Sequence, residues 1–247
     1  MLGGLPHFDA VNRSAHALSC DLQYVMDIAS SSTCFSSEFV DTFGGFHPPG
    51  EKRVLSQMHA GDRVRTDMLL LLLREITVRA VPGAMAELGV HRGISAKLIH
   101  HYCPERKLYL FDTFSGFSKA DLAEESIAVG YNQQQQFSDT NAELAMKTIA
   151  PRNANAIPIV GWFPASVPPE VAAETFAFVH LDADLEAPTS AGLEFFWPRL
   201  NPQGFLVVHD YNEWPGARLA VDRFLAGNRI AAVPMPDKSG SIVLAKF

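Results

Sequence analysis

The chain has 247 residues, of which 47% are hydrophobic and 19% are charged. This length and composition favour one large globular domain over two small ones. The formal net charge is −7, and no long cluster of lysine or arginine is present, so nucleic acid is not expected as a partner. The longest apolar run, Met68 to Leu73, is far shorter than the roughly 20 residues of a membrane-spanning helix. No membrane association is expected either.

Three widely spaced cysteines, Cys20, Cys34 and Cys103, form no C-x-x-C motif. Charged residues interrupt the N-terminus, so no signal peptide is apparent. Both features predict a cytoplasmic protein. Whether the chain forms a homo-oligomer stays open.

The first 55 residues are rich in Ser, Gly and Phe and show weak periodicity. We interpret residues 1–55 as an N-terminal extension and residues 56–247 as the main domain. The aromatic residues of the extension fit a lid over a binding site, a partner surface or ordinary packing. They are Phe35, Phe39, Phe43 and Phe46.

Helical and strand patterns alternate along the main domain. A helix is expected from about Arg63 to Arg79, and Pro82-Gly83 ends it. Thr140-Asn141-Ala142-Glu143 predicts a capping box for a later helix. Further helices are expected at about 94–102, 140–149, 189–200 and 216–225, and strands at 84–88, 107–111, 157–160, 176–181, 204–208 and 241–245. This alternation predicts an α/β fold with a doubly wound, mostly parallel sheet.

The turn after the first expected strand contains Gly89 and Gly93 in a G-x-x-x-G spacing. Ligands of open parallel sheets bind beyond the carboxyl ends of the strands. Glycines at such a turn let the backbone approach a ligand at a helix N-terminus, but they also fit a purely structural tight turn. The dinucleotide fingerprint G-x-G-x-x-G is absent.

The second expected strand ends at Asp112, which lies 25 residues after Glu87. A carboxylate at this place accepts hydrogen bonds from both hydroxyls of a ribose, which favours an adenosine ligand. The alternative is that Asp112 caps the turn formed by residues 113–116.

Two later strand ends carry ionisable residues. Asp182, Asp184 and Glu186 follow one strand, and His209-Asp210 follows the next. We expect Asp182, His209 and Asp210 to form a metal site or a general-base site. Asp184 and Glu186 are expected instead to cap the following helix.

Five segments, in this order and spacing, resemble the macrocin O-methyltransferase family, which methylates sugar hydroxyls and related positions on bacterial natural products. The resemblance covers about residues 55 to 226. It implies a seven-stranded sheet of the class I methyltransferase type that binds S-adenosylmethionine and acts on a small-molecule acceptor. The segments are Glu87–Gly93, Phe111–Phe117, Phe137–Thr140, Gly161–Pro164 and His180–Leu185.

The resemblance also implies roles for individual residues. Glu87 and Gly89 lie near the methionine part of the cofactor, Asp112 lies on its ribose, and Asp139 and Trp162 lie by the adenine. The full set expected to contact the cofactor is Glu87, Gly89, Gly93, Ser95, Asp112, Thr113, Asp139, Trp162 and Asp182.

Most members of the family are similar in needing magnesium, held by the aspartate that Asp182 matches and by an Asp-Asp pair. Here that pair is His209-Asp210, and magnesium tolerates imidazole poorly. Three arrangements stay open: a weakened magnesium site at Asp182 and Asp210, a softer ion that accepts His209, or a metal-free enzyme. The metal-free arrangement, with His209 as the base, is preferred.

Other functions also stay open. A hydroxyl oxygen is the preferred acceptor atom, and a nitrogen is the alternative. A non-catalytic adenosine-binding protein of the same fold is a further alternative. A nicotinamide-dependent oxidoreductase is disfavoured by the missing glycine fingerprint.

Overall fold

The computed structural model describes residues 62–117, 122, 137–149 and 155–247. The expected N-terminal extension and its phenylalanines lie outside the described residues. No helix among the described residues is long and apolar enough to span a membrane.

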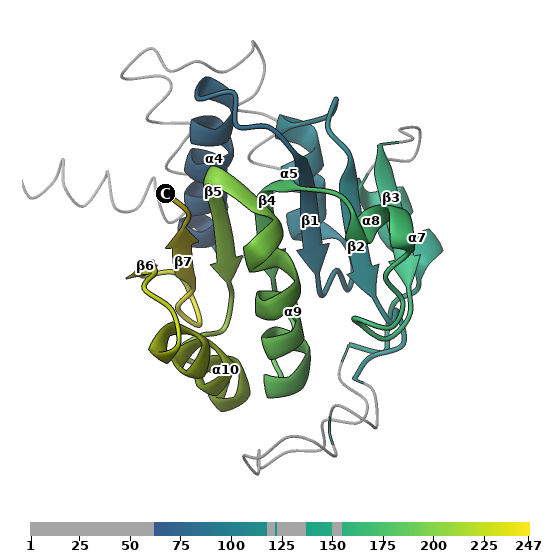
Figure 1. The fold of residues 1–247 in the computed structure, drawn as a ribbon. Coiled ribbons are helices and arrows are strands. Elements are labelled where there is room, and N and C mark those ends of the chain that lie inside the picture. Colours follow the sequence, from purple (N-terminus) through teal and green to yellow (C-terminus); the bar gives the residue numbers. More distant parts are fainter. Residues whose placement is uncertain (1–61, 118–121, 123–136, 150–154) are drawn as a thin grey trace, which may run out of the picture. The chain divides into compact units, whose positions relative to one another are not determined.

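A seven-stranded sheet forms the centre of the domain, in the order β3-β2-β1-β4-β5-β7-β6 (Figure 1). The strands from β3 to β5 in this order are parallel, and β7 runs antiparallel to both β5 and β6. The prediction of a mostly parallel, doubly wound sheet is therefore confirmed. The strands are β1 Ala84–Leu88, β2 Leu108–Asp112, β3 Ala156–Val160, β4 Phe176–Leu181, β5 Leu200–Val208, β6 Ala231–Pro234 and β7 Ile242–Ala245.

Helices cover both faces of the sheet (Figure 1). On one face, α5 contacts both α4 and α7, and on the other α9 packs against α10. The sequence pattern predicts all of these helices but neither the short α8 nor β6, whose residues are mostly exposed. The helices are α4 Arg63–Val78, α5 Ile94–Tyr102, α7 Ala142–Ile149, α8 Pro169–Ala172, α9 Glu186–Arg199 and α10 Pro215–Ala226.

Helix α7 begins differently from the predicted capping box. Asn141 Oδ1 accepts a hydrogen bond from the backbone N–H of Leu144 at 2.9 Å. The hydroxyl of Thr140 donates instead to the carbonyl of His91 at 2.7 Å. The capping box is wrong because Thr140 has a tertiary partner, which ties the start of α7 to the turn between β1 and α5.

Helix α9 also lacks the predicted cap. Its N-cap position is Leu185, whose side chain makes no capping hydrogen bond. Glu186 lies in the first turn and forms an ion pair with Arg223 of α10. Asp184 lies before the cap position, with its side chain buried beside the sheet. The expectation that Asp184 or Glu186 caps this helix is therefore wrong, because Asp184 is hydrogen-bonded to Asp210 and Glu186 is paired with Arg223.

The core beside β2 and β4 is aromatic. Phe111, Phe176 and Phe196 are fully buried, and the ring of Phe196 on α9 meets the other two edge to face. Burial of each such side chain contributes about 1.5–3 kcal/mol to folding. This packing fixes α9 against the strands whose ends carry the polar residues.

Backbone hydrogen bonds continue across the carboxyl ends of the parallel strands. The N–H of Gly89 donates to Phe111 O at 2.9 Å, and the N–H of Asp182 donates to Leu88 O at 2.8 Å. The N–H of His209 continues the series to Leu181 O at 2.8 Å. The residues that follow β1, β4 and β5 therefore lie side by side at one edge of the sheet.

Candidate active site

A cavity of about 390 Å³ lies at the carboxyl ends of β1, β2, β4 and β5. It is lined by most of the residues that the sequence singles out. Glu87, Gly93 and Asp139 lie outside this lining. The predicted residues that line the cavity are Gly89, Ser95, Asp112, Thr113, Trp162, Asp182, His209 and Asp210. We call the part formed at β1 and β2 the β1–β2 side, and the part formed at β4 and β5 the β4–β5 side.

The two glycines of the G-x-x-x-G turn each have a packing reason. Gly89 has φ +88°, and a Cβ there would lie 1.9 Å from the carbonyl oxygen of Asp182. Gly93 has φ +77°, and its Cβ would lie 2.6 Å from Cγ1 of Ile149 on α7. Only glycine fits both the positive φ and the close approach. The tight-turn interpretation therefore holds for both, while Gly89 also lines the cavity.

Asp112 joins the turns after β1 and β2. Its Oδ2 accepts the N–H groups of Val90 and His91, each at 2.7 Å. Its Oδ1 accepts the N–H of Phe114 at 2.7 Å, as the turn-capping interpretation predicts. A carboxylate has about four acceptor positions. Three backbone donors therefore leave room for a ligand hydroxyl at the cavity.

Asp139 lies beside the β1–β2 side rather than in its wall. Its carboxylate accepts from His91 Nε2 at 2.7 Å and pairs with Arg92. The hydrogen bond from His91 and the charge of Arg92 lower the pKa of Asp139. Phe137 meets the ring of His91 edge to face. Trp162, which is 41% exposed, also lines the cavity.

Glu87 forms a buried pair in the centre of the sheet. It lies directly opposite His180 in the register of β1 and β4, and its Oε1 lies 2.7 Å from His180 Nδ1. Both side chains are fully buried. Burial raises the pKa of Glu87, and the hydrogen bond with His180 partly offsets this effect.

The β4–β5 side is built around the imidazole of His209. Its Nδ1 lies 3.0 Å from Asp182 Oδ1 and 2.9 Å from Asp210 Oδ2. The side chains of His209 and Asp210 are buried, and that of Asp182 is 21% exposed. The structure therefore brings together the three residues predicted to form a metal or general-base site.

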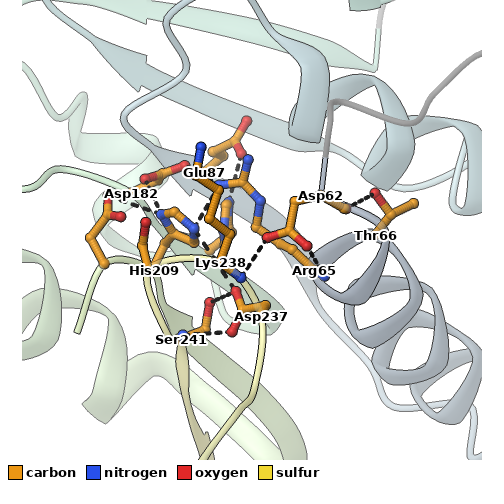
Figure 2. Close-up of polar contacts among 12 residues, drawn as sticks. Asp62, Arg65, Thr66, Glu87, Asp182, His209, Asp237, Lys238 and Ser241 are labelled. Carbon is orange, nitrogen blue, oxygen red and sulfur yellow. Dashed lines mark hydrogen bonds and ion pairs between the residues drawn. The ribbon is translucent and has the colours of Figure 1, made fainter. Parts of the chain in front are cut away.

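An arginine that the sequence reasoning missed completes this cluster. Arg65 Nη1 lies 2.9 Å from His209 Nε2 and 3.4 Å from Asp182 Oδ2. Figure 2 shows the Arg65 side chain reaching from α4 to the imidazole. Arg65 precedes Asp182 by 117 positions, and nothing in the helical pattern of α4 indicates that it faces the strand ends.

The position of Arg65 is fixed by contacts at the start of α4. Asp62 caps this helix by accepting the Arg65 N–H at 3.0 Å, and its other oxygen accepts the Lys238 N–H at 2.9 Å. Asp237 accepts from both the N–H and the hydroxyl of Ser241 (Figure 2). These bonds join the first turn of α4 to the segment before β7.

The neighbours of His209 act on its protonation in opposite directions. Burial lowers its pKa, but Asp182 and Asp210 outweigh this and raise the pKa of the imidazole to about 10. The same pairing lowers the pKa of Asp182 against the effect of its burial. A guanidinium can only donate hydrogen bonds, so its contact with Nε2 requires a lone pair there. The Arg65 guanidinium thus opposes the two carboxylates: they favour the protonated imidazole, whereas its contact with Nε2 favours the neutral form with the proton on Nδ1.

Asp184 is a second residue whose role the sequence reasoning missed. It lines the cavity and is buried. Burial, the charges of Asp182 and Asp210 and a hydrogen bond with Asp210 raise the pKa of Asp184 well above its usual range. Asp184 stands two positions after Asp182. Alternate residues of an extended chain point to the same side, so the sequence spacing indicates that the two carboxylates lie near one another.

Comparison with known proteins identifies relatives for most of the chain. The family model described as macrocin-O-methyltransferase (TylF) matches residues 53–240. The chain is 29% identical over 163 residues to an 8-demethyl-8-(2,3-dimethoxy-alpha-L-rhamnosyl)-tetracenomycin-C 4'-O-methyltransferase of Streptomyces olivaceus, a match that covers 60% of each chain. It is 27% identical over 157 residues to a mycinamicin III 3''-O-methyltransferase of Micromonospora griseorubida, over 58% of this chain and 61% of that one. The chain thus spans about 60% of the length of these relatives.

Solved structures share the fold. The O-methyltransferase NovP is similar with a TM-score of 0.63 and 22% identity, over 74% of this chain and 79% of that one. The calicheamicin methyltransferase CalS11 is similar with a TM-score of 0.61 and 18% identity, over 98% and 99% of the two chains. These likenesses confirm the expected class I methyltransferase fold.

Proposed function

Because the chain belongs to the macrocin-O-methyltransferase family, we propose that it transfers the methyl group of S-adenosylmethionine to a hydroxyl of a small natural product or sugar. The observation that carries the proposal is the single cavity that joins Gly89 and Asp112 to the cluster around His209. One end suits an adenosine ligand, and the other holds groups able to accept a proton.

The cofactor occupies the β1–β2 side. Asp112 accepts a ribose hydroxyl while its three backbone hydrogen bonds hold the surrounding turns. Ser95, Thr113 and Trp162 contribute the adjacent wall. A helix N-terminus at this turn favours the carboxylate of the methionine part.

The three predicted cofactor residues that do not line the cavity act through the residues they contact. Glu87 and Gly93 are positioning residues, because Glu87 is paired with His180 and Gly93 lets α5 pack on α7. Asp139 orients His91 and Arg92, which line the cavity.

Methyl transfer is an in-line displacement. The acceptor oxygen forms a bond to the methyl carbon, the carbon–sulfur bond breaks, and its electron pair returns to sulfur to give S-adenosylhomocysteine. The acceptor hydroxyl replaces Arg65 as the hydrogen-bond donor to Nε2 of His209. Its proton then moves to that nitrogen. Asp182 and Asp210 then stabilise the imidazolium that forms. Holding the reacting atoms in line supplies much of the rate enhancement.

The names of the relatives support a hydroxyl acceptor. Both relatives described above carry O-methyltransferase names, one for a rhamnosyl tetracenomycin and one for mycinamicin III. A glycosylated natural product is therefore the first acceptor class to test.

The test is transfer of a labelled methyl group. The purified full chain is incubated with S-adenosylmethionine labelled at the methyl carbon and a panel of deoxysugar-bearing natural products, and the products are analysed by mass spectrometry. We expect label on an acceptor oxygen and none with His209→Gln at matched time. Label on an amine nitrogen would contradict the hydroxyl assignment. Absence of binding to S-adenosylhomocysteine would contradict the methyltransferase assignment itself.

A further inference from the structure

The ionisable side chains at the ends of β4 and β5 lie close enough together to form a metal site. Single atoms of Asp182, His209 and Asp210 lie within 4.8 Å of one another, close enough to share an ion. The same is true of Asp62, His209 and Asp237. Family resemblance also implies magnesium at this place. The chemistry of the donor atoms therefore decides whether a divalent ion fits.

Both ring nitrogens of His209 are already in contact with neighbouring side chains. Nδ1 lies within 3.0 Å of Asp182 and Asp210 oxygens and donates its proton to them. Nε2 accepts from Arg65 at 2.9 Å. Magnesium is usually held by one or two carboxylates and several waters. Here both carboxylates are already paired with cationic or N–H groups, Asp182 with His209 and Arg65 and Asp210 with His209. The residues present do not fit magnesium.

Arg65 already supplies a positive charge at this place. Its Nη1 lies between the His209 ring and Asp182 Oδ2, and its side chain lines the cavity. A divalent ion held by Asp182 would lie close to this charge and be repelled by it. Asp62 and Lys238 fix the helix turn that presents the guanidinium, so its position follows from the fold.

We propose that the guanidinium of Arg65 takes the place of the divalent cation at the acceptor end of this cavity. The proposal rests on the proposed function, since it assigns the group that faces the acceptor oxygen. Arg65 holds Asp182 in place and donates to the oxygen on which negative charge develops as the proton leaves. A guanidinium, with five N–H donors, serves both partners at once.

The first test is binding of Mn²⁺, a paramagnetic stand-in for Mg²⁺, to the purified full chain. Free Mn²⁺ is measured by electron paramagnetic resonance in titrations of the wild type and of the double variant Arg65→Met, His209→Asp. We expect no stoichiometric site in the wild type. The double variant should gain one site per chain, with an affinity at least about tenfold higher, because it regains a third carboxylate and loses the competing charge.

Two further variants sharpen the result. Arg65→Lys retains the positive charge and should bind Mn²⁺ no better than the wild type. Arg79→Met removes an exposed arginine paired with Glu75 on the same helix and should also change nothing. Circular dichroism and thermal unfolding establish that each variant is folded.

Two outcomes would overturn the proposal. One is a stoichiometric Mn²⁺ site in the wild type that Asp182→Asn abolishes. The other is a folded double variant that gains no site, because the guanidinium would then not be what occupies the place of the ion. S-adenosylhomocysteine binding, measured on the same samples, is independent of these results. If S-adenosylhomocysteine does not bind, the proposed function is contradicted, but the conclusion drawn from Mn²⁺ binding is unaffected.

Discussion

The two sides of the cavity are built from different kinds of groups. The β1–β2 side uses backbone N–H groups gathered on one carboxylate, Asp112, and a glycine turn that lets β1 approach β4. The β4–β5 side uses charged side chains that contact one another, with His209 at their centre and Arg65 opposite the carboxylates. A site built from backbone N–H groups permits few substitutions at the glycines and carboxylates that shape it. A side-chain cluster permits exchange of one charged group for another.

This difference predicts that substitutions are tolerated less on the β1–β2 side than on the β4–β5 side. On the β1–β2 side the positive φ of Gly89 and the three bonds of Asp112 fix the residue type. On the β4–β5 side, His209 stands where the family resemblance implies an aspartate, and Arg65 Nη1 lies 2.9 Å from its Nε2. If the two sides are separable, a substitution on one side should leave the other intact.

The largest effect is expected on the β4–β5 side. His209→Gln removes the proton acceptor and should lower the single-turnover rate of methyl transfer by roughly 10²–10⁴-fold, the usual contribution of general-base catalysis. His101→Gln on α5 is the matched control and should retain the rate. An unchanged rate in the His209 variant would exclude the imidazole as base.

The next effect is on stability, at the glycine that joins the two sides. Gly89→Ala places a Cβ where the Asp182 carbonyl lies and forces alanine into a left-handed φ. We expect a loss of about 3 kcal/mol or more in the free energy of unfolding, measured by urea denaturation. Gly227→Ala is the control, because φ is −89° there and the nearest atom lies 3.8 Å from the new Cβ. It should change stability by less than about 0.5 kcal/mol, and equal losses in both variants would contradict the packing account of Gly89.

A smaller effect concerns pH. The pKa of Asp184 is raised by burial and by Asp182 and Asp210, so the folded state binds its proton more tightly than the unfolded state. Asp184 therefore lowers the free energy of unfolding as the pH rises above 3.8, the ordinary pKa of an aspartate. Asp184→Asn should remove this cost, and its stability relative to the wild type should increase between about pH 5 and about pH 8. A constant difference across this range would show that Asp184 ionises freely in the folded protein.

The sequence predicts the sheet and several residues of the β1–β2 lining, because local signals mark them. Short apolar runs give the strands from β1 to β5 together with β7, and Gly89 and Asp112 stand at strand ends where ligands bind. The errors have tertiary causes. Thr140 bonds to His91 instead of capping α7, and Glu186 pairs with Arg223 of the neighbouring helix.

The β4–β5 side is only partly predictable. Asp182, His209 and Asp210 follow adjacent strands, so their meeting is expected from the topology. Arg65 belongs to a helix that precedes the sheet, and its approach to His209 depends on how α4 packs and on the bonds of Asp62. No spacing along the chain encodes that contact. A single side chain from a distant helix thus changes the predicted chemistry of the cluster.

Cofactor binding in this cavity is tested by calorimetric titration of the full chain with S-adenosylhomocysteine, in the presence of EDTA, for the wild type and Asp112→Asn. Asp222→Asn, on α10 and away from the cavity, is the control. We expect one site per chain in the wild type and the control, unaffected by EDTA, and binding at least about tenfold weaker in Asp112→Asn. No binding by the wild type, or equal binding by Asp112→Asn, would contradict the assignment of the cavity to this cofactor.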